Sequence, residues 1–439
     1  ADVVRTARAL GVPVDHDLAE EMVFDADEDG TSQLTLDELI ATIEHVHIDE
    51  TIDDDDVAAV VATLKSDFLT CGPQVDAFEQ EFAAMVGAKH AVAVNNATAA
   101  LHLAMLVAEI GAGDRVVTSP NTFVSSANCA AFVGATPDFG DIDPASYNLC
   151  PDALAEGWQN DTKAVVAVAY AGQSPDMPAI AKIARSHGAV IIEDGCHGIG
   201  GGFTIDGTDY KIGGHPWADI TTFSFHPVKT MTTGEGGVLV TNNDKYAHRA
   251  RLLRSHGITR ESDEFTGLGS DSATHQEQGG WYYEMQSLGY NYRITDLQCA
   301  LGRSQLKKLP SFIERRRAIV AKYNAAFADL SWLQTPQILQ SANTAYISWH
   351  LYSVLIDFKM LGLSRREVMQ RLREQGIGSQ VLYIPVHLQP YYRNQFGYGV
   401  GKCPNAEAYY EQTLSLPLFP KMADADVEKV ISSVKALAS

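Results

Sequence analysis

The chain has 439 residues, of which 46% are hydrophobic and 20% charged, and this composition is typical of a folded protein with two or three domains. Its composition excludes a disordered chain, a collagen and a small disulfide-rich scaffold. The net charge of −22 argues against a nucleic-acid partner, because affinity for phosphate backbones comes from Lys and Arg. No segment has the roughly 20 apolar residues of a membrane helix, and the first residues lack the apolar core of a signal peptide. We therefore expect no membrane partner and a cytoplasmic location.

The first 56 residues are the most acidic part of the chain, with 18 Asp and Glu side chains against two Arg. Within them, the run DEDGTSQLTLDEL has the ligand spacing of an EF-hand calcium loop, which supplies the six to eight oxygens that Ca²⁺ requires. The candidate ligands are Asp27, Asp29, Thr31, Gln33 and Glu38. The flanking segments DLAEEMVFD and LDELIATIEHV have helical apolar spacing. We expect an EF-hand-like helix-loop-helix that binds Ca²⁺.

One position of this loop departs from the EF-hand pattern. Ser32 stands where the pattern prefers Gly for a tight bend, although Gly30 lies nearby. The register that begins at Asp25 is worse, because it puts Leu36 at the last ligand position. EF-hands generally work in pairs, and the sequence contains only one such loop. A degenerate acidic helical hairpin without a metal therefore remains an alternative.

From residue 57 onward, short β-rich runs alternate with helical stretches. The expected strands are HAVAV, DRVVTS, TPDFGDI, KAVVAVAY, AVIIED, ADITTFSF and GGVLVT, and segments such as TAALHLAMLVAEI and MPAIAKIARSHG separate them. This alternation predicts an α/β domain with a largely parallel sheet. Ligands of such sheets bind beyond the carboxyl ends of the strands, so the residues that follow each run are the candidate site residues.

Three of these strand ends carry side chains with complementary chemistry. After HAVAV, small residues and Thr98 open a helix whose free N–H groups can hold a phosphate, although small residues commonly begin helices. Asp194 ends AVIIED and is either a helix-capping residue or a buried carboxylate that needs a cationic partner. Lys229 lies between a strand and a glycine-rich turn, where a desolvated amine could form a Schiff base. An anion site, a carboxylate and an amine are the three contacts that pyridoxal 5′-phosphate (PLP) requires.

From about Phe68 to Ser439 the sequence resembles the DegT/DnrJ/EryC1/StrS family of sugar aminotransferases, which are PLP enzymes of fold type I. The resemblance rests on the motifs NNATAALHLA, TSPNTFVSSAN, AYAGQSPDM, IIEDGCHG, FSFHPVKTMTTGEGG, LGYNYRITDLQCALG and YIPVHLQPYY. The segments WYYEMQSLGYNYRITD and ISWHLY are most similar to the branch that aminates a UDP-linked 4-keto-6-deoxy-N-acetylhexosamine in pseudaminic acid synthesis.

The resemblance assigns roles to individual positions. Lys229 would bind the cofactor covalently and move the reaction's proton, and Asp194 would pair with the pyridine nitrogen. The other implied cofactor contacts are Phe123 on the ring face, Ala97, Thr98 and Ser224 at the phosphate, Gln173 and His197 around the ring, and Asn291 reaching the neighbouring subunit's phosphate. Asn291 thus implies a homodimer with shared active sites. Arg293, His350, Tyr383 and His387 are the expected substrate contacts. Phe123 and His197 could instead be packing residues.

The expected reaction transfers an amino group from L-glutamate to the C4 keto group of the UDP-sugar. A 3-aminotransferase of a sister branch and a PLP sugar dehydratase are alternatives, and the dehydratase is disfavoured because that branch replaces Lys229 by His. A calcium-responsive binding protein on the same scaffold is the non-enzymatic alternative. We expect an acidic unit over residues 1–56, a large PLP-binding domain over residues 57–305 and a smaller C-terminal α/β domain over residues 306–439.

Overall fold

The computed structural model describes residues 51–267, 281–339 and 346–438. The acidic N-terminal segment, with the expected calcium ligands Asp27, Asp29, Thr31, Gln33 and Glu38, lies outside the described residues, so the EF-hand-like unit stays a prediction. From Thr51 onward the chain forms one compact unit. None of the helices in the described ranges is long and apolar enough to cross a membrane.

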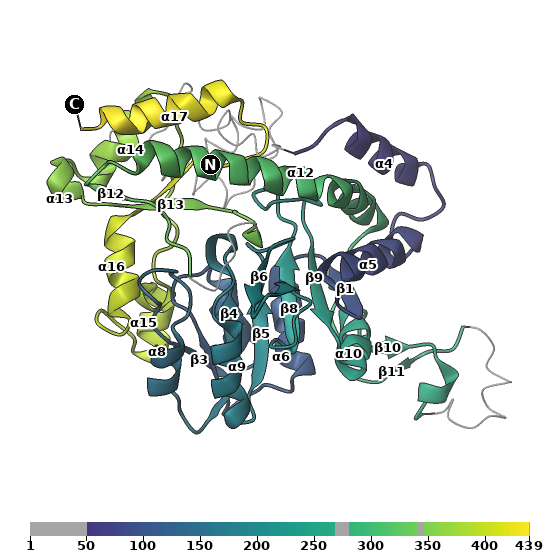
Figure 1. Ribbon diagram of the computed structural model, residues 1–439. Helices are drawn as coiled ribbons and strands as arrows, with labels where there is room; N and C mark the ends of the chain where they lie inside the picture. The colour runs from purple at the N-terminus through teal and green to yellow at the C-terminus, as the bar shows by residue number, and fades with distance from the viewer. Residues whose placement is uncertain (1–50, 268–280, 340–345, 439) are drawn as a thin grey trace, which may run out of the picture. The chain divides into compact units, whose positions relative to one another are not determined.

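A seven-stranded sheet forms the centre of this unit (Figure 1), with the strand order β1-β9-β8-β5-β4-β2-β3. The strands are β1 (His90–Val94), β2 (Arg115–Thr118), β3 (Thr136–Phe139), β4 (Thr162–Val168), β5 (Val190–Asp194), β8 (Ile220–Ser224) and β9 (Gly237–Thr241). Neighbours from β3 to β8 are parallel, and β9 runs antiparallel to both β8 and β1. The predicted α/β fold with a mainly parallel sheet is confirmed, and the carboxyl ends of all strands but β9 lie at one edge.

Helices cover both faces of the sheet, because its strands are apolar on both sides. On β1, Val92 and Val94 pack with α6 (Ala97–Val107), whereas Ala91 and Ala93 pack with α5 (Pro73–Val86). The first face also carries α7 (Ser125–Phe132) and α10 (Asp244–Arg254), and the second carries α8 (Pro151–Glu156), α9 (Met177–Ser186) and part of α12 (Asp296–Phe327). Burial on both sides explains why the strands read as continuous apolar runs.

A second hydrophobic core lies toward the C-terminus. Its antiparallel sheet has the order β12 (Leu333–Gln334), β13 (Tyr352–Ile356) and β14 (Thr413–Leu416). The helices of this part are α13 (Phe358–Leu361), α14 (Arg365–Glu374), α15 (Pro390–Phe396), α16 (Pro404–Gln412) and α17 (Asp424–Ala436). Helix α12 runs unbroken from the first core into the second, so the domain boundary that we propose near residue 305 falls within this helix.

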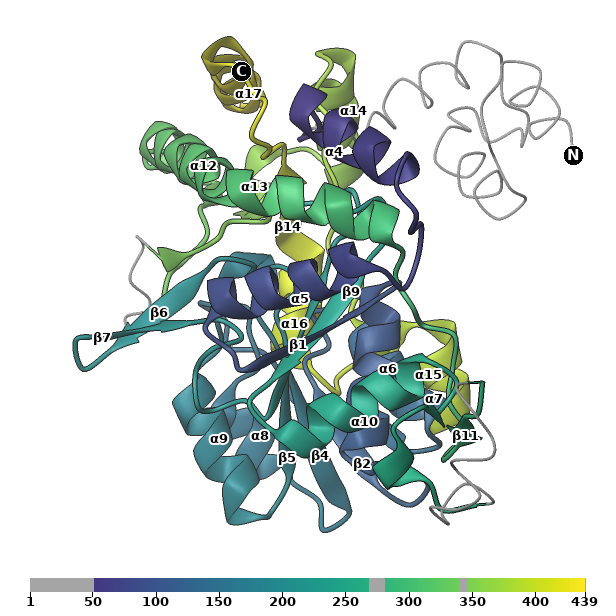
Figure 2. The same cartoon turned by 90° about the vertical axis from the view of Figure 1, so that its right-hand side faces the viewer.

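The remaining elements are short and lie around these two cores. They are α4 (Asp54–Leu64), β6 (Gly202–Ile205), β7 (Thr208–Lys211), β10 (Ile258–Thr259), β11 (Glu284–Met285) and the 3₁₀ turns Tyr170–Gly172, Ser262–Glu264 and Val386–Leu388. Helix α4 packs on α12 (Figure 2), where Gln305 and Lys308 contact the buried Asp56 carboxylate at 2.7 and 2.9 Å. These two contacts tie the first described helix to the body of the protein.

The turn after β4 depends on one glycine. Gly172 has φ +103°, and a Cβ at this position would lie 1.8 Å from the carbonyl oxygen of Ser348. The left-handed backbone and the close approach of another segment both require a residue without a side chain. Gly172 therefore fixes where the chain leaves β4 and enters the strand-end edge.

We expect Gly172→Ala to lower the free energy of unfolding by at least ~2 kcal/mol, because both backbone strain and a steric clash oppose the methyl group. Urea unfolding followed by circular dichroism measures this loss. Gly378→Ala is the matched control, since no heavy atom lies within 4 Å of the added Cβ. Equal midpoints for the two variants would contradict the assigned role of Gly172.

Candidate active site

The carboxyl ends of five parallel strands bring the predicted site residues to one edge of the sheet. Asp194 is the last residue of β5 and Ser224 is the last residue of β8. Ala97 follows β1, Phe123 follows β2 and Gln173 follows β4. Residues that are up to 127 positions apart in the sequence therefore share one region, as the parallel topology requires.

The carboxylate of Asp194 is buried and accepts two hydrogen bonds. The backbone N–H of Cys196 donates to Oδ1 at 3.1 Å, and the hydroxyl of Ser126 donates to Oδ2 at 2.6 Å. The preceding Glu193 points to the opposite face of the strand, where it pairs with buried His215 at 3.1 Å. Because a buried charge needs donors, the two bonds both stabilise the Asp194 anion and fix its orientation.

Lys229 lies in the segment that follows β8, and its side chain is half-buried. Burial lowers the pKa of its amine, and the nearby side chains of Cys196 and Asp194 act in the opposite direction. The neutral amine, which is the nucleophilic form, is therefore more populated at neutral pH than in a free lysine. Asp194 ends β5 and Lys229 follows the neighbouring parallel strand β8, so the topology brings the two predicted catalytic residues to the same edge of the sheet.

A chain of polar contacts connects His197 to the C-terminal core. The backbone N–H of Ala171 donates to Nδ1 of His197 at 3.3 Å, and Nε2 lies 3.2 Å from the Tyr383 hydroxyl. Burial lowers the pKa of His197 well below its ordinary value, so the ring is neutral at pH 7. Since Nδ1 accepts, we assign the ring proton to Nε2, which donates it to Tyr383. The His350 ring lies 4.3 Å from the His197 ring, between centroids, and completes this side of the site.

Phe123 is a large apolar side chain that the protein leaves uncovered. Its side chain is 57% exposed, and its ring lies 6.5 Å from that of Tyr383. An exposed aromatic ring at the strand-end edge, with Tyr383 as its neighbour, is suited to stacking on a planar ligand. This favours the role that the sequence resemblance implied over a packing role.

The expected phosphate residues also lie together. The amides of Ala97 and Thr98 begin α6 and therefore have no acceptor in a preceding helical turn. The Thr98 hydroxyl lies 2.8 Å from that of Ser125 at the start of α7. Ser224 pairs with Gly237, where a Cβ would lie 2.6 Å from the amide nitrogen of Ala97. The start of α6 is thus lined by hydroxyls and open backbone, as an anion site requires.

Four other predicted residues have different surroundings. The Gln173 amide binds the backbone of Gln337 and Leu339, and His387 Nε2 lies 2.9 Å from Glu407 on α16. Asn291 is exposed and Arg293 is half-buried. Among the described residues, no hydrogen bond or ring contact joins these four side chains to Asp194, Lys229 or His197.

Ser125 and Ser126 were not among the predicted site residues, although both stand in the motif TSPNTFVSSAN. Ser125 contacts the expected phosphate residue Thr98, and Ser126 donates to Asp194. The available signal was a pair of hydroxyls shortly after the aromatic Phe123, at the start of a helix. Cys196 is a third side chain of the site that was missed. Burial, and to a lesser extent Asp194, raise the pKa of its thiol well above the usual value.

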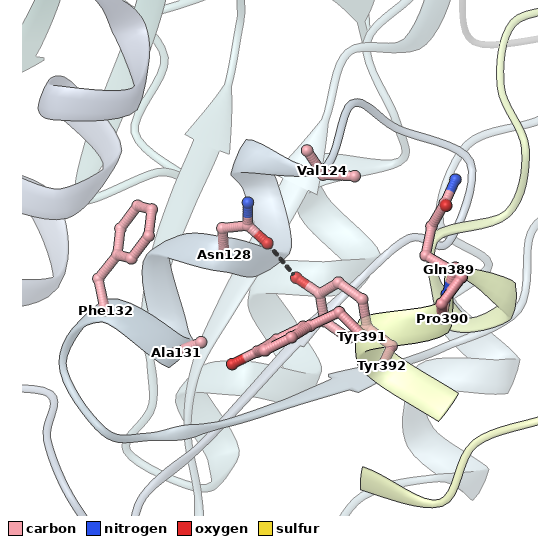
Figure 3. Close-up of a pocket in the computed structure, with 8 residues that line it drawn as sticks. All are labelled: Val124, Asn128, Ala131, Phe132, Gln389, Pro390, Tyr391 and Tyr392. Atoms are coloured by element: carbon pink, nitrogen blue, oxygen red, sulfur yellow. Dashed lines mark hydrogen bonds between the residues drawn. The ribbon is translucent and has the colours of Figure 1, made fainter. Parts of the chain in front are cut away.

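A separate hollow is lined by residues of α7 and of the start of α15 (Figure 3). Its lining residues are Val124, Asn128, Ala131, Phe132, Gln389, Pro390, Tyr391 and Tyr392, and the Tyr392 hydroxyl donates to Asn128 at 2.5 Å. None of its lining residues is titratable near neutral pH, and none belongs to the group around Lys229. We therefore place the active site at the strand ends and not in this hollow.

The strand-end residues fit the PLP that the sequence resemblance implied. Thr98, Ala97 and Ser224 would hold the phosphate, Asp194 would bind the ring nitrogen and Lys229 would bind the aldehyde. Phe123 has a ring face free for stacking. The donor set contains an anion site, an oriented carboxylate and an amine of lowered pKa, which are the chemical requirements of this cofactor.

Comparisons with known proteins identify the family of the chain. The sequence profile of the DegT/DnrJ/EryC1/StrS aminotransferase family matches residues 50–435. The spore coat polysaccharide biosynthesis protein SpsC of Bacillus subtilis is 43% identical over 385 residues, which cover 87% of this chain and 94% of SpsC.

Solved structures are similar over the same region. PseC of Helicobacter pylori, an aminotransferase involved in the biosynthesis of pseudoaminic acid, is 30% identical with a TM-score of 0.77 and covers 89% of this chain and 97% of its own. Spr1654 of Streptococcus pneumoniae, in its PLP form, is 28% identical with a TM-score of 0.78, and the match covers 89% of this chain and 97% of Spr1654.

The lowered pKa of Lys229 predicts how its reactivity depends on pH. In cofactor-free protein, labelling of Lys229 by acetic anhydride should reach its half-maximal rate at a lower pH than labelling of N-acetyl-lysine amide in the same tube, because burial favours the neutral amine. Peptide mapping by mass spectrometry at a series of pH values measures both rates. A half-maximum at or above that of the standard would refute the predicted shift.

Proposed function

Because the chain belongs to the DegT/DnrJ/EryC1/StrS aminotransferase family, whose members are PLP-dependent sugar aminotransferases, we propose that its substrate is a UDP-linked 4-keto-6-deoxy-N-acetylhexosamine. The amino donor is L-glutamate, and the nitrogen goes to C4 of the sugar. The product serves the synthesis of a pseudaminic-acid-type or related surface sugar. The similarity to PseC supports this choice of substrate, and the similarity to SpsC supports a role in surface polysaccharides.

The observation that carries the proposed reaction type is that Asp194 ends β5 and Lys229 follows the neighbouring parallel strand β8, with the Asp194 carboxylate acting on the pKa of the Lys229 amine. When bound, PLP accepts the amino group and delocalises the electrons of the adjacent carbon. Lys229, whose amine loses its proton readily, acts as the base that removes a proton from the donor carbon and as the acid that returns one to the sugar carbon. A site with His in place of Lys229 would favour elimination of a hydroxyl, and this chain retains Lys.

Other side chains orient and enclose the reactants. Asp194 stabilises positive charge on the ring nitrogen, and Phe123 restricts movement of the ring. The Tyr383 oxygen accepts a hydrogen bond from His197, so the Tyr383 hydroxyl proton stays available to donate to a substrate oxygen. We propose that His350, Arg293 and His387 contact the nucleotide sugar, although His387 would have to leave Glu407 to do so.

We further propose a cytoplasmic homodimer with shared active sites. Asn291 is exposed and has no contact with the residues around Lys229 among the described residues, as expected if it serves the neighbouring subunit. All six cysteines are free, which supports a reducing compartment.

Turnover tests this proposal directly. With PLP, L-glutamate and the UDP-4-keto sugar, mass spectrometry should detect the 4-amino sugar and 2-oxoglutarate, and Lys229→Ala should lower the rate by about 10³-fold or more because it removes the acid–base group. Borohydride reduction of the PLP-loaded protein should mark Lys229 in peptide maps.

Lys211→Ala serves as the control, because this lysine is exposed and donates to the backbone carbonyl of Met85 in α5. Product from a 3-keto sugar and from no 4-keto sugar would assign the chain to a sister branch. Loss of a hydroxyl without gain of nitrogen would favour the dehydratase, and an unmodified Lys229 in the PLP-loaded protein would contradict the proposed aminotransferase.

We also propose that residues 27–38 bind Ca²⁺, on the ligand spacing of the sequence alone. Calorimetric titration should show binding by the wild-type chain and a loss of about tenfold or more in affinity for Glu38→Gln, because the closing bidentate carboxylate loses one of its charged oxygens. Gln33→Ala is the matched control, since position 7 of such a loop binds the metal through its backbone carbonyl. Flat traces for the wild-type chain would reject the metal site and favour the acidic hairpin.

A further inference from the structure

The Asp194 carboxylate is held by a relay of two buried hydroxyls. The Ser126 hydroxyl, with 0% exposure, lies 2.6 Å from Asp194 Oδ2, and the Thr122 hydroxyl lies 2.7 Å from that of Ser126. An ionised carboxylate only accepts, so Ser126 must donate to Asp194. The Ser126 oxygen is then the acceptor for Thr122. The direction of both protons is therefore fixed, from Thr122 to Ser126 to Asp194.

The contact of Ser126 joins two elements of the fold. Ser126 is the second residue of α7, and its hydroxyl spans from α7 to the end of β5, between positions 68 residues apart. Its partner Thr122 stands one residue before Phe123, so the same turn carries the exposed ring and the two buried hydroxyls.

The two donors to Asp194 act on different oxygens. The backbone N–H of Cys196 donates to Oδ1. This donor belongs to the same chain segment as Asp194, and no side-chain substitution removes it. Ser126 is the side chain that holds Oδ2. Without it, the carboxylate can rotate about its Cβ–Cγ bond and its second oxygen loses a charge-assisted hydrogen bond.

We propose that Ser126 is a positioning residue for the cofactor's ring nitrogen: through its hydrogen bond, oriented by Thr122, it fixes the carboxylate of Asp194 toward that nitrogen. The proposal rests on the PLP dependence of the family and adds a residue that acts through Asp194. Ser126 itself does not touch the reacting atoms. Its effect should therefore appear only with a ligand that has a ring nitrogen.

Two cofactors separate this role from a general structural one. Cofactor-free full-length protein is titrated with PLP and with its 1-deaza analogue, in which a C–H group replaces the ring nitrogen. Ser126→Ala should weaken PLP binding by about tenfold or more, the usual effect of losing a hydrogen bond to a charged group, and should change the affinity for the analogue by less than about twofold. Ser126→Thr should restore most of the PLP affinity, because it keeps the hydroxyl.

Thr118→Val is the matched control, since Thr118 is equally buried and gives its hydroxyl to the Val166 carbonyl, away from Asp194. This variant should change the affinities for PLP and for the analogue by the same factor. If Ser126→Ala does not fold, Thr122→Val tests the same relay, because it removes the hydroxyl that donates to Ser126. It should again weaken the binding of PLP more than the binding of the analogue.

Equal losses for PLP and the analogue, or no loss for either, would overturn the positioning role. A wild-type chain that binds neither cofactor would instead contradict the PLP dependence on which the proposed function stands. The two failures are thus distinguishable in one set of titrations.

Discussion

The buried Asp194 carboxylate is the constraint on which the rest of the site depends. A charge at this depth is stable only with donors on both oxygens, and the protein supplies them from its own strand-end turn and from α7. That requirement brings α7 against the end of β5, and with it Ser125 at the start of α7 and Phe123 in the turn before it. The same charge opposes the lowering of the Lys229 pKa by burial, so Asp194 acts on the amine of the other predicted catalytic residue.

The framework of the site was predictable from the sequence because it follows from local patterns. Apolar runs of strand length marked β1, β5 and β8, and parallel topology then placed the residues after them at one edge. Lys229 and Asp194 could be recognised because a lysine in an apolar region and a carboxylate at a strand end each need a partner. These inferences required only the period of the pattern and the chemistry of single residues.

The contacts of Ser126, His387 and Tyr383 could not be predicted, because they depend on the rotation of helices and on long-range packing. Whether Ser126 faces Asp194 or solvent is decided by the orientation of α7 against two strands, and short helices of small residues carry little periodicity. His387 was expected near the substrate, and in the structure its Nε2 lies 2.9 Å from the Glu407 carboxylate on α16. Tyr383 approaches His197 because it packs in a cluster with Tyr170 and Tyr409, and no local signal encodes such long-range packing.

Helix α12 belongs to both hydrophobic cores. Its earlier residues, such as Leu309 and Ile313, pack beneath the large sheet, and later ones, such as Tyr323 and Phe327, form a wall of the C-terminal core. Neither core can lose this helix without exposing apolar surface to water. Limited proteolysis between the cores should consequently yield no autonomous fragment: a nicked chain would stay associated or be degraded as a whole.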